Sequence, residues 1–379
     1  MSLVVDEHRQ YLADRPRINA FAKAIAEVVR PGQVVVDLAS GTGILGLMAC
    51  RAGAARVYSI EAGGMVEVAR EAAKANGFAD RVVFVKGFST HVDLPEKVDV
   101  IIGDQIGNFG FNAGVIEHYS DARARFLKPE GITLPSRVDL WLMPVEAAEL
   151  FGQVEFWNTA PAGFDFRSTR ALAANTGYQV NLEASAGLGD PVALVSLDVN
   201  RATVAPVQCE ASAGVKRSGV LHGIGGWFSA QLSPSVRMTN SPLDEKRINR
   251  RQIYFPIDRA VAVEEGDTVR VRMMIRPGDL VVNWNVEVIS GTGQKKGSFR
   301  HSTWKGMLLN QEDFERTRPD FRPKLTRRGE GRRTVVNLCD GMRALAEVEE
   351  EVWRRHPELF RNREEAAAFV AEVVTRYSE

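Results

Sequence analysis

Apolar residues along this chain of 379 residues follow two patterns, and the change falls near Pro135. In the N-terminal part, short apolar runs that predict buried strands alternate with segments of helical spacing. Strands are predicted at 34–37, 56–60, 82–86 and 98–103, and helices at 18–29, 44–51 and 65–76. Such alternation is typical of a parallel, doubly wound sheet, in which ligands bind beyond the carboxyl ends of the strands. We therefore expect an α/β, Rossmann-like domain over residues 1–134, with an N-terminal capping helix.

After Pro135 the pattern becomes one of strands that are separated by turn signals such as Pro277-Gly278-Asp279. Strand-like stretches cover 140–145, 192–199, 220–229, 252–256, 268–275 and 280–289. This pattern predicts an all-β, barrel-like domain over residues 135–310. An aromatic-rich insert interrupts this domain at about 151–178. Residues 311–336 are basic and polar and predict a linker, and helical spacing returns in a small C-terminal module over 337–379.

Composition adds few constraints, and those few are mostly exclusions. The chain is 45% hydrophobic and 25% charged, as in ordinary globular proteins, and its apolar runs are far too short for a membrane span. Lys+Arg and Asp+Glu are both 48, so net charge does not favour binding to nucleic acid or membrane. The three cysteines, Cys50, Cys209 and Cys339, are too scattered for a disulfide framework or a zinc site, and we expect no metal. No signal peptide is visible, so a cytoplasmic protein is expected.

The stretch from Val34 to Gly46 is the clearest candidate for a ligand site. A strand ends in Asp37, Gly41 and Gly43 make a tight turn, and the helix that follows directs free N–H groups toward the turn. Residues 41–46 match G-x-G-x-x-G, which alone would also suit a nicotinamide dinucleotide. Asp37 would repel a pyrophosphate but suits the amino-acid part of S-adenosylmethionine. Glu61 ends the next strand, where it could bind the ribose hydroxyls of either cofactor. S-adenosylmethionine is therefore favoured.

With these residues laid out, residues 8–310 resemble the protein arginine methyltransferase family. His8 and Arg17 stand at the spacing of its N-terminal cofactor-closing motif, and 36–45 resembles its motif I, with Ala39 where the first glycine is usual. The resemblance implies methyl transfer from S-adenosylmethionine with S-adenosylhomocysteine as product, a substrate barrel, and a homodimer formed through the 151–178 arm. The cofactor-binding residues expected from motif and resemblance together are His8, Arg17, Asp37, Ala39, Gly41, Thr42, Gly43, Ile44, Leu45, Glu61, Ala62, Ser89 and Asp104.

The acceptor end departs from the family pattern. The family grips a guanidinium with two glutamates on the loop after strand four, and the corresponding residues here are Asp104 and Ala113. The family's Thr-His-Trp loop falls near 248–250, where none of its three residues is kept. Since the methyl donor is a cation, a lost carboxylate and a nearby arginine disfavour a second cation and favour a neutral acceptor. The expected substrate-binding residues are Asn108, Asn112, Asn249 and Arg250.

Two acids are candidates for catalysis. Asp104 could take or orient the departing proton. If a helix already runs through Ala113, Glu117 lies one turn on, on the same face, and could act as a displaced second carboxylate; a surface acid is the alternative.

Several alternatives for the function of the chain stay open at this stage. The acceptor could be arginine or a different group on a peptide or small metabolite. The lost residues also leave open a catalytically inactive scaffold or peptide-binding protein, against which the complete cofactor set argues. The C-terminal module lies outside the family and resembles peptide-binding modules of peptide-modifying enzymes.

Overall fold

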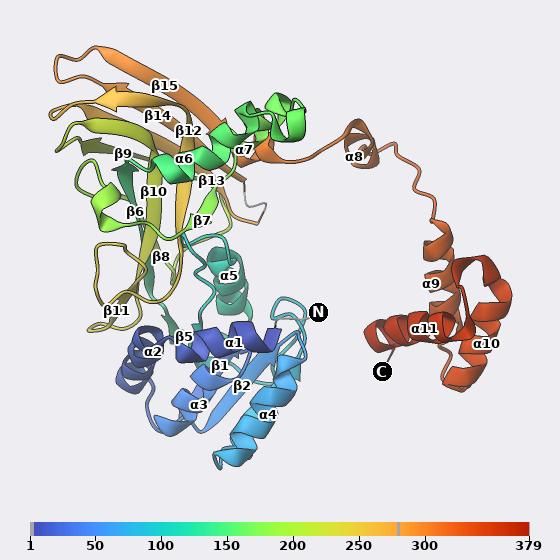
Figure 1. Ribbon diagram of the computed structural model, residues 1–379. Coiled ribbons are helices and arrows are strands. Elements are labelled where there is room, and N and C mark those ends of the chain that lie inside the picture. Colours follow the sequence, from blue (N-terminus) through green and yellow to red (C-terminus); the bar gives the residue numbers. More distant parts are fainter. Residues whose placement is uncertain (1–3, 279–280, 379) are drawn as a thin grey trace. The chain divides into compact units, whose positions relative to one another are not determined.

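The structure is a computed structural model that describes residues 4–278 and 281–378, and it divides into two compact units, Met1–Met307 and Leu308–Glu379 (Figure 1). The first unit begins with a parallel sheet in the order β3-β2-β1-β4-β5. Its strands are β1 Val34–Leu38, β2 Arg56–Glu61, β3 Val82–Lys86, β4 Val98–Gly103 and β5 Leu127–Leu134. The predicted Rossmann-like class is therefore confirmed.

Helices cover this sheet where the sequence shows apolar residues at helical spacing, and two further helices appear. The helices are α1 Val4–Ala13, α2 Arg15–Val28, α3 Ile44–Arg51, α4 Met65–Ala75 and α5 Val115–Arg125. Helix α2 begins early because Asp14 caps it by accepting from the Arg17 N–H at 3.3 Å, with Pro16 in the first turn. Its buried face includes Phe21 and Ile25. The sequence did not predict α1, which has no buried residue, or α5.

Two antiparallel sheets form the second half of the first unit, as the barrel-like prediction requires. One has the order β7-β12-β10-β6-β8 with β11 against β10, and the other has the order β15-β14-β13-β9. The strands are β6 Arg137–Val145, β7 Tyr178–Val180, β8 Val192–Asp198, β9 Val207–Gly214, β10 Gly219–Gln231, β11 Arg237–Thr239, β12 Gln252–Val263, β13 Thr268–Arg276, β14 Val281–Ile289 and β15 Lys295–Ser302. The predicted strand 280–289 starts at residue 280, which with Asp279 of the predicted turn lies outside the described residues.

The aromatic-rich insert is mostly helical. It consists of α6 Ala148–Glu155, the short turns η1 Phe156–Asn158, η2 Pro161–Gly163 and η3 Arg167–Thr169, and α7 Arg170–Ala174. Val154, Ala173 and Ala174 form a small core of their own. Phe164 nevertheless remains 67% exposed.

The second unit is helical, with α8 Gln311–Arg316, α9 Arg327–Leu338, α10 Leu345–Arg355 and α11 Arg363–Tyr377. Helices α9, α10 and α11 share a core that includes Val335, Val352 and Val370. Residues 327–336, which the sequence assigns to the linker, belong to α9. No helix in the described part of the chain has the length and apolar character needed to cross a membrane.

Candidate active site

The turn between β1 and α3 requires unusual backbone conformations. Ala39, Gly41 and Gly43 have φ values of 49°, 54° and 74°, in the left-handed region that glycine adopts at least cost. A Cβ on Gly41 would lie 2.4 Å from His8 Cε1, so glycine is what allows α1 to pack against the turn. Helix α3 begins directly after Gly43 and presents the N–H groups of its first turn at this edge of the sheet.

Glu61 joins this turn from the end of β2. Its Oε2 accepts from the Gly41 N–H at 2.9 Å and its Oε1 accepts from the Gly63 N–H at 2.7 Å. The carboxylate is thus held beside the glycine turn, which is where the sequence predicts a ribose ligand.

Asp37 supplies a test of whether the site fits a cationic ligand. The side chain is buried, and its Oδ2 accepts from the Gly46 N–H at 2.9 Å. Its Oδ1 is also buried but has no hydrogen-bond partner among the described residues. Burial raises the pKa of Asp37 from 3.8 to about 7. A buried carboxylate oxygen without a donor is rare in a folded protein, and it indicates that a ligand group belongs there. The ammonium group of S-adenosylmethionine has the required charge and hydrogens.

A cavity of about 660 Å³ runs along this edge of the sheet, within the range of small-molecule sites. Of the predicted cofactor residues, those that line it are His8, Arg17, Asp37, Ala39, Gly41, Thr42, Ile44, Leu45 and Asp104. The other four are not lining residues: Gly43 is at the N-cap of α3, Glu61 is the last residue of β2 and Ala62 follows it, and Ser89 is buried in the segment after β3. All four predicted substrate-binding residues line the same cavity. The structure therefore brings the cofactor and acceptor candidates together.

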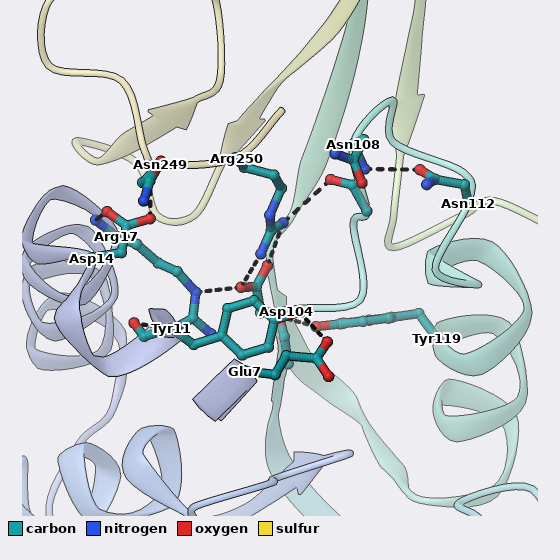
Figure 2. Close-up of polar contacts among 12 residues, drawn as sticks. Glu7, Tyr11, Asp14, Arg17, Asp104, Asn108, Asn112, Tyr119, Asn249 and Arg250 are labelled. Atoms are coloured by element: carbon teal, nitrogen blue, oxygen red, sulfur yellow. Dashed lines mark hydrogen bonds and ion pairs between the residues drawn. The ribbon is translucent and has the colours of Figure 1, made fainter. Parts of the chain in front are cut away.

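The acceptor end of the cavity is built around Asp104, which directly follows β4 (Figure 2). Its Oδ2 accepts from Arg17 Nε at 2.5 Å and from Arg250 Nη2 at 2.7 Å, and its Oδ1 accepts from Arg250 Nη1 at 3.1 Å. The side chains of Asp104, Arg17 and Arg250 are only 7%, 8% and 13% exposed, respectively. Burial by itself would raise the pKa of Asp104, but the charges and hydrogen bonds of Arg250 and Arg17 lower it. The carboxylate therefore stays ionised, and the cluster carries one net positive charge.

The predicted amide residues brace the loops around this cluster. Asn112 Oδ1 accepts from the backbone N–H groups of Asn108 at 2.8 Å and Phe109 at 3.1 Å. Asn108 Nδ2 donates to the Arg251 carbonyl at 2.9 Å, and the Asn249 N–H donates to Asp14 Oδ2 at 2.9 Å. These contacts tie the loop after β4 and the cap of α2 to the segment before β12.

Glu117 is placed away from the cluster. Helix α5 begins at Val115 with Gly114 at its N-cap, so Ala113 precedes the helix and the condition for the displaced-carboxylate role is not met. The Glu117 carboxylate instead accepts a hydrogen bond from the Gly278 N–H, and Glu117 is not among the residues that line the cavity.

Two tyrosines contribute to the site without having been singled out from the sequence (Figure 2). Tyr11, on α1, lines the cavity, and its ring centroid lies 5.3 Å from the Arg17 guanidinium carbon. Tyr119 is fully buried, and its hydroxyl lies 3.0 Å from the Gly103 carbonyl oxygen, at the end of β4 just before Asp104. Tyr11 lies between His8 and Arg17, the two residues of the predicted cofactor-closing motif, and this position was the signal for it. Tyr119 lies in a helix that local pattern did not reveal.

Comparison with known proteins assigns the chain to a family. The family model for the arginine methyltransferase oligomerization subdomain matches residues 136–287, and that for ribosomal protein L11 methyltransferase matches residues 20–138. A probable protein arginine N-methyltransferase 6.1 from Oryza sativa subsp. indica is 31% identical over 261 residues, which cover 65% of this chain and 69% of that protein. The chain belongs to the protein arginine methyltransferase family. The predicted reaction class and the predicted cofactor, S-adenosylmethionine, are thereby confirmed.

Other similar proteins agree with this assignment. Protein arginine N-methyltransferase PRMT10 of Arabidopsis thaliana is 26% identical over 332 residues, covering 77% of this chain and 87% of that protein. The crystal structure of Arabidopsis thaliana protein arginine methyltransferase 10, in an open conformation, matches with a TM-score of 0.69 and 26% identity, over 78% of this chain and 96% of that one. The Trypanosoma brucei PRMT1 enzyme-prozyme heterotetrameric complex with AdoHcy has the same fold, with a TM-score of 0.70, 22% identity, and coverage of 78% of this chain and 97% of that one.

As a protein arginine methyltransferase, this enzyme has an unusual acceptor end. Asp104 and Ala113 stand at the two positions that the sequence resemblance predicts to correspond to the family's guanidinium-gripping glutamates. Asp104 is already bound by a guanidinium of the chain itself, that of Arg250, and Ala113 has no polar side chain. The departures from the expected pattern therefore lie at Asp104 and Ala113, and the glycine turn between β1 and α3 is not among them.

Proposed function

We propose that this enzyme transfers the methyl group of S-adenosylmethionine to a neutral nitrogen or oxygen atom on a peptide or small molecule, rather than to a guanidinium. The observation that carries this proposal is the pairing of both Asp104 oxygens with Arg17 and Arg250. A carboxylate that is saturated in this way has little capacity left to orient a third guanidinium.

The charges at this end of the cavity support the same conclusion. An acceptor guanidinium would have to displace Arg250 from a buried ion pair, and breaking such a pair costs roughly 3–5 kcal/mol. If it did not displace Arg250, it would add a cation beside a cluster that already carries a net positive charge and beside the positively charged methyl donor. A neutral acceptor avoids both costs.

The chemistry of this step requires a nucleophile with a free lone pair. S-adenosylmethionine supplies a methyl group on a positively charged sulfur. The lone pair of the acceptor forms the new bond to the methyl carbon, the carbon–sulfur bond breaks, and its electron pair remains on sulfur. The acceptor proton then passes to water at the cavity mouth. Because Asp104 is held ionised by two arginines, we assign it the role of positioning Arg17 and Arg250, in place of the proton-accepting role expected from sequence.

We also propose roles for the cofactor residues. The unpartnered Asp37 oxygen would accept from the cofactor's ammonium group, and Glu61, held beside the turn, would accept from ribose hydroxyls. Gly41 allows His8 to pack over the turn, and Arg17 links that closing segment to the acceptor end through Asp104. Positioning of donor and acceptor in line would supply most of the rate acceleration.

Methylation of arginine is the second candidate, favoured by the names of the relatives, which are arginine N-methyltransferases. It requires that the Arg250 guanidinium leave Asp104 when a substrate arrives.

We further propose a homodimer formed through the 151–178 arm. Two observations support this homodimer. The arm exposes three aromatic residues, Phe156, Phe164 and Phe166, which are 49%, 67% and 44% exposed. In addition, the family model for an oligomerization subdomain matches residues 136–287, which include the arm. A cytoplasmic location is supported by three unpaired cysteines.

The test is methyl transfer measured by mass spectrometry. Purified enzyme and S-adenosylmethionine would be offered free arginine, an Arg-Gly-rich peptide, and matched peptides that present lysine, histidine, asparagine or serine in place of arginine. We expect a gain of one methyl group on a neutral acceptor and none on arginine. The Gly41→Val variant, whose side chain would collide with His8 at the cofactor turn, is the control for enzyme-dependent transfer. Transfer to arginine alone would contradict the proposal.

A further inference from the structure

A second cavity, smaller and apolar, adjoins the acceptor end of the site. It has a volume of about 170 Å³ and shares the lining residues Asn112 and Gln179 with the larger cavity. Its walls come from the loop after β4, through Phe109, and from the barrel strands β12, β13 and β14. The cofactor turn contributes nothing to it. A group in this cavity would therefore belong to the acceptor and not to the methyl donor.

The walls are mostly hydrophobic, and several of their side chains are buried. Phe109, Phe255 and Ile275 are 3%, 3% and 1% exposed, and each packs into the main hydrophobic core. Gly177 helps to keep the space open, because a Cβ there would lie 3.3 Å from Phe255 Cε1. Arg276, at the end of β13, also lines the cavity and is exposed. A charged group placed against these apolar walls would lose its hydration, which disfavours a charge in this cavity.

We propose that the methyl acceptor carries an aromatic or branched aliphatic group that inserts into this cavity while its nucleophile lies beside the Asp104 cluster. The size fits one ring, since an apolar cavity of about 150 Å³ stays dry and binds benzene in another protein. The shared residues Asn112 and Gln179 make the two cavities neighbours, so one small molecule or two adjacent peptide residues could occupy both. This inference rests on the proposed function, because it names what the neutral acceptor looks like.

The first experiment measures binding without requiring turnover. Protein labelled with ¹³C at isoleucine δ1 methyl groups would be titrated with indole, and the signals of Ile253 and Ile275, two lining residues, would be assigned through Ile253→Val and Ile275→Val. We expect both signals to shift. Val282→Phe, which places a ring into the cavity, should abolish the shifts, whereas Val83→Phe, the same change on an exposed position of β3, should preserve them. Affinity for S-adenosylhomocysteine, measured by calorimetry, should be unchanged in both variants.

The second experiment measures selectivity of methyl transfer. Peptides with the preferred acceptor residue would be compared with tryptophan, phenylalanine, leucine or glycine beside it. Loss of a well-placed apolar contact is worth about 10-fold or more in kcat/KM, so glycine should lower kcat/KM by at least that factor. Val282→Phe should remove the advantage of the apolar neighbour and leave the glycine peptide unaffected. Ile253→Ala, which enlarges the cavity, should shift the preference toward the larger ring.

Each failure of these experiments has a distinct meaning. Indole that shifts neither isoleucine at saturating concentration overturns the inference, and so does equal turnover of apolar and glycine peptides by the wild type. If only arginine peptides are methylated, the proposed function fails. The cavity is then still tested by whether Val282→Phe raises KM for arginine peptides that carry an apolar neighbour.

Discussion

The cluster around Asp104 predicts how this site could be converted to accept a guanidinium. The change is the pair Arg250→Ala and Ala113→Glu. The first removes the guanidinium that now occupies Asp104, and the second restores a carboxylate at the other gripping position. Ala113 is exposed and lines the cavity, so a glutamate there can face the acceptor without being buried.

The expected size of the effect follows from the contacts. Arg250 makes two of the three charged hydrogen bonds to Asp104, and each such bond is worth about 1.5–3 kcal/mol. A substrate guanidinium that regains one of them and pairs with the new glutamate gains a similar amount again. Since each 1.4 kcal/mol is tenfold, these two gains, about 3–6 kcal/mol together, predict a rise of roughly 10²- to 10⁴-fold in kcat/KM for an arginine peptide. Thermal stability should fall, because Arg17 alone remains on Asp104.

The assay is methyl transfer to an Arg-Gly-rich peptide, followed by mass spectrometry, for wild type, both single variants and the double variant. Arg247→Ala, at an exposed arginine of the same segment that is not a lining residue of this cavity, is the matched control and should change little. The reasoning is refuted if the double variant binds S-adenosylhomocysteine normally and still gains no activity on arginine. It is also refuted if the wild type methylates arginine as fast as the double variant does.

Three further predictions concern the cofactor turn and the arm. Because burial raises the pKa of Asp37 to about 7, affinity for S-adenosylhomocysteine, measured by calorimetry, should be full above that pH and weaken as pH falls through it, by up to about tenfold per unit. The Asp37→Asn variant should bind S-adenosylhomocysteine weakly, with an affinity that does not change with pH. A wild-type affinity that stays constant from about pH 8 to about pH 5.5, a range that brackets the pKa of about 7, would contradict this prediction. Ala39→Gly should relieve the positive φ of 49° and raise the unfolding midpoint in a thermal scan by roughly 2–4 °C, for a gain of about 1 kcal/mol. Phe164→Asp should lower the oligomeric state seen by analytical ultracentrifugation, whereas Val83→Asp, at another exposed apolar position, should not.

The sequence was most informative where a structural signal is local. The turn from Val34 to Gly46 could be predicted because strand, acid, glycines and helix follow one another within a short segment. The strand β15 could not, because only Gly297, Phe299 and His301 of its alternating residues are buried, and one of them alone is strongly hydrophobic. Helix α1 has no buried residue at all, so no apolar stripe marks it.

The acceptor end illustrates a different limit. The family resemblance placed Asp104 and Arg250 near each other, but it did not show that they pair. They are 146 residues apart, on the loop after β4 and on the segment before β12, and only the packing of two domains sets their distance. Glu117 failed to reach the cluster for a local reason, since α5 starts two residues too late. Side-chain partners across domains are set by tertiary packing, which periodicity does not report.

The two ends of the cavity differ in what they lack, and this difference argues against an inactive scaffold. At the cofactor end, Asp37 buries an oxygen without a partner and Ala39 holds a strained backbone angle, and both features cost stability unless a ligand uses them. At the acceptor end, Asp104 is fully satisfied by arginines of the chain itself. The protein therefore needs a cofactor but does not need a charge from its acceptor.

Acceptor affinity should then come from apolar contact and depend little on ionic strength, whereas recognition of a guanidinium by exposed carboxylates would weaken as salt screens the charges. A KM for the preferred acceptor that rises steeply between 50 mM and about 1 M salt, where the screening length falls to roughly 3 Å, would show that charge still governs this site.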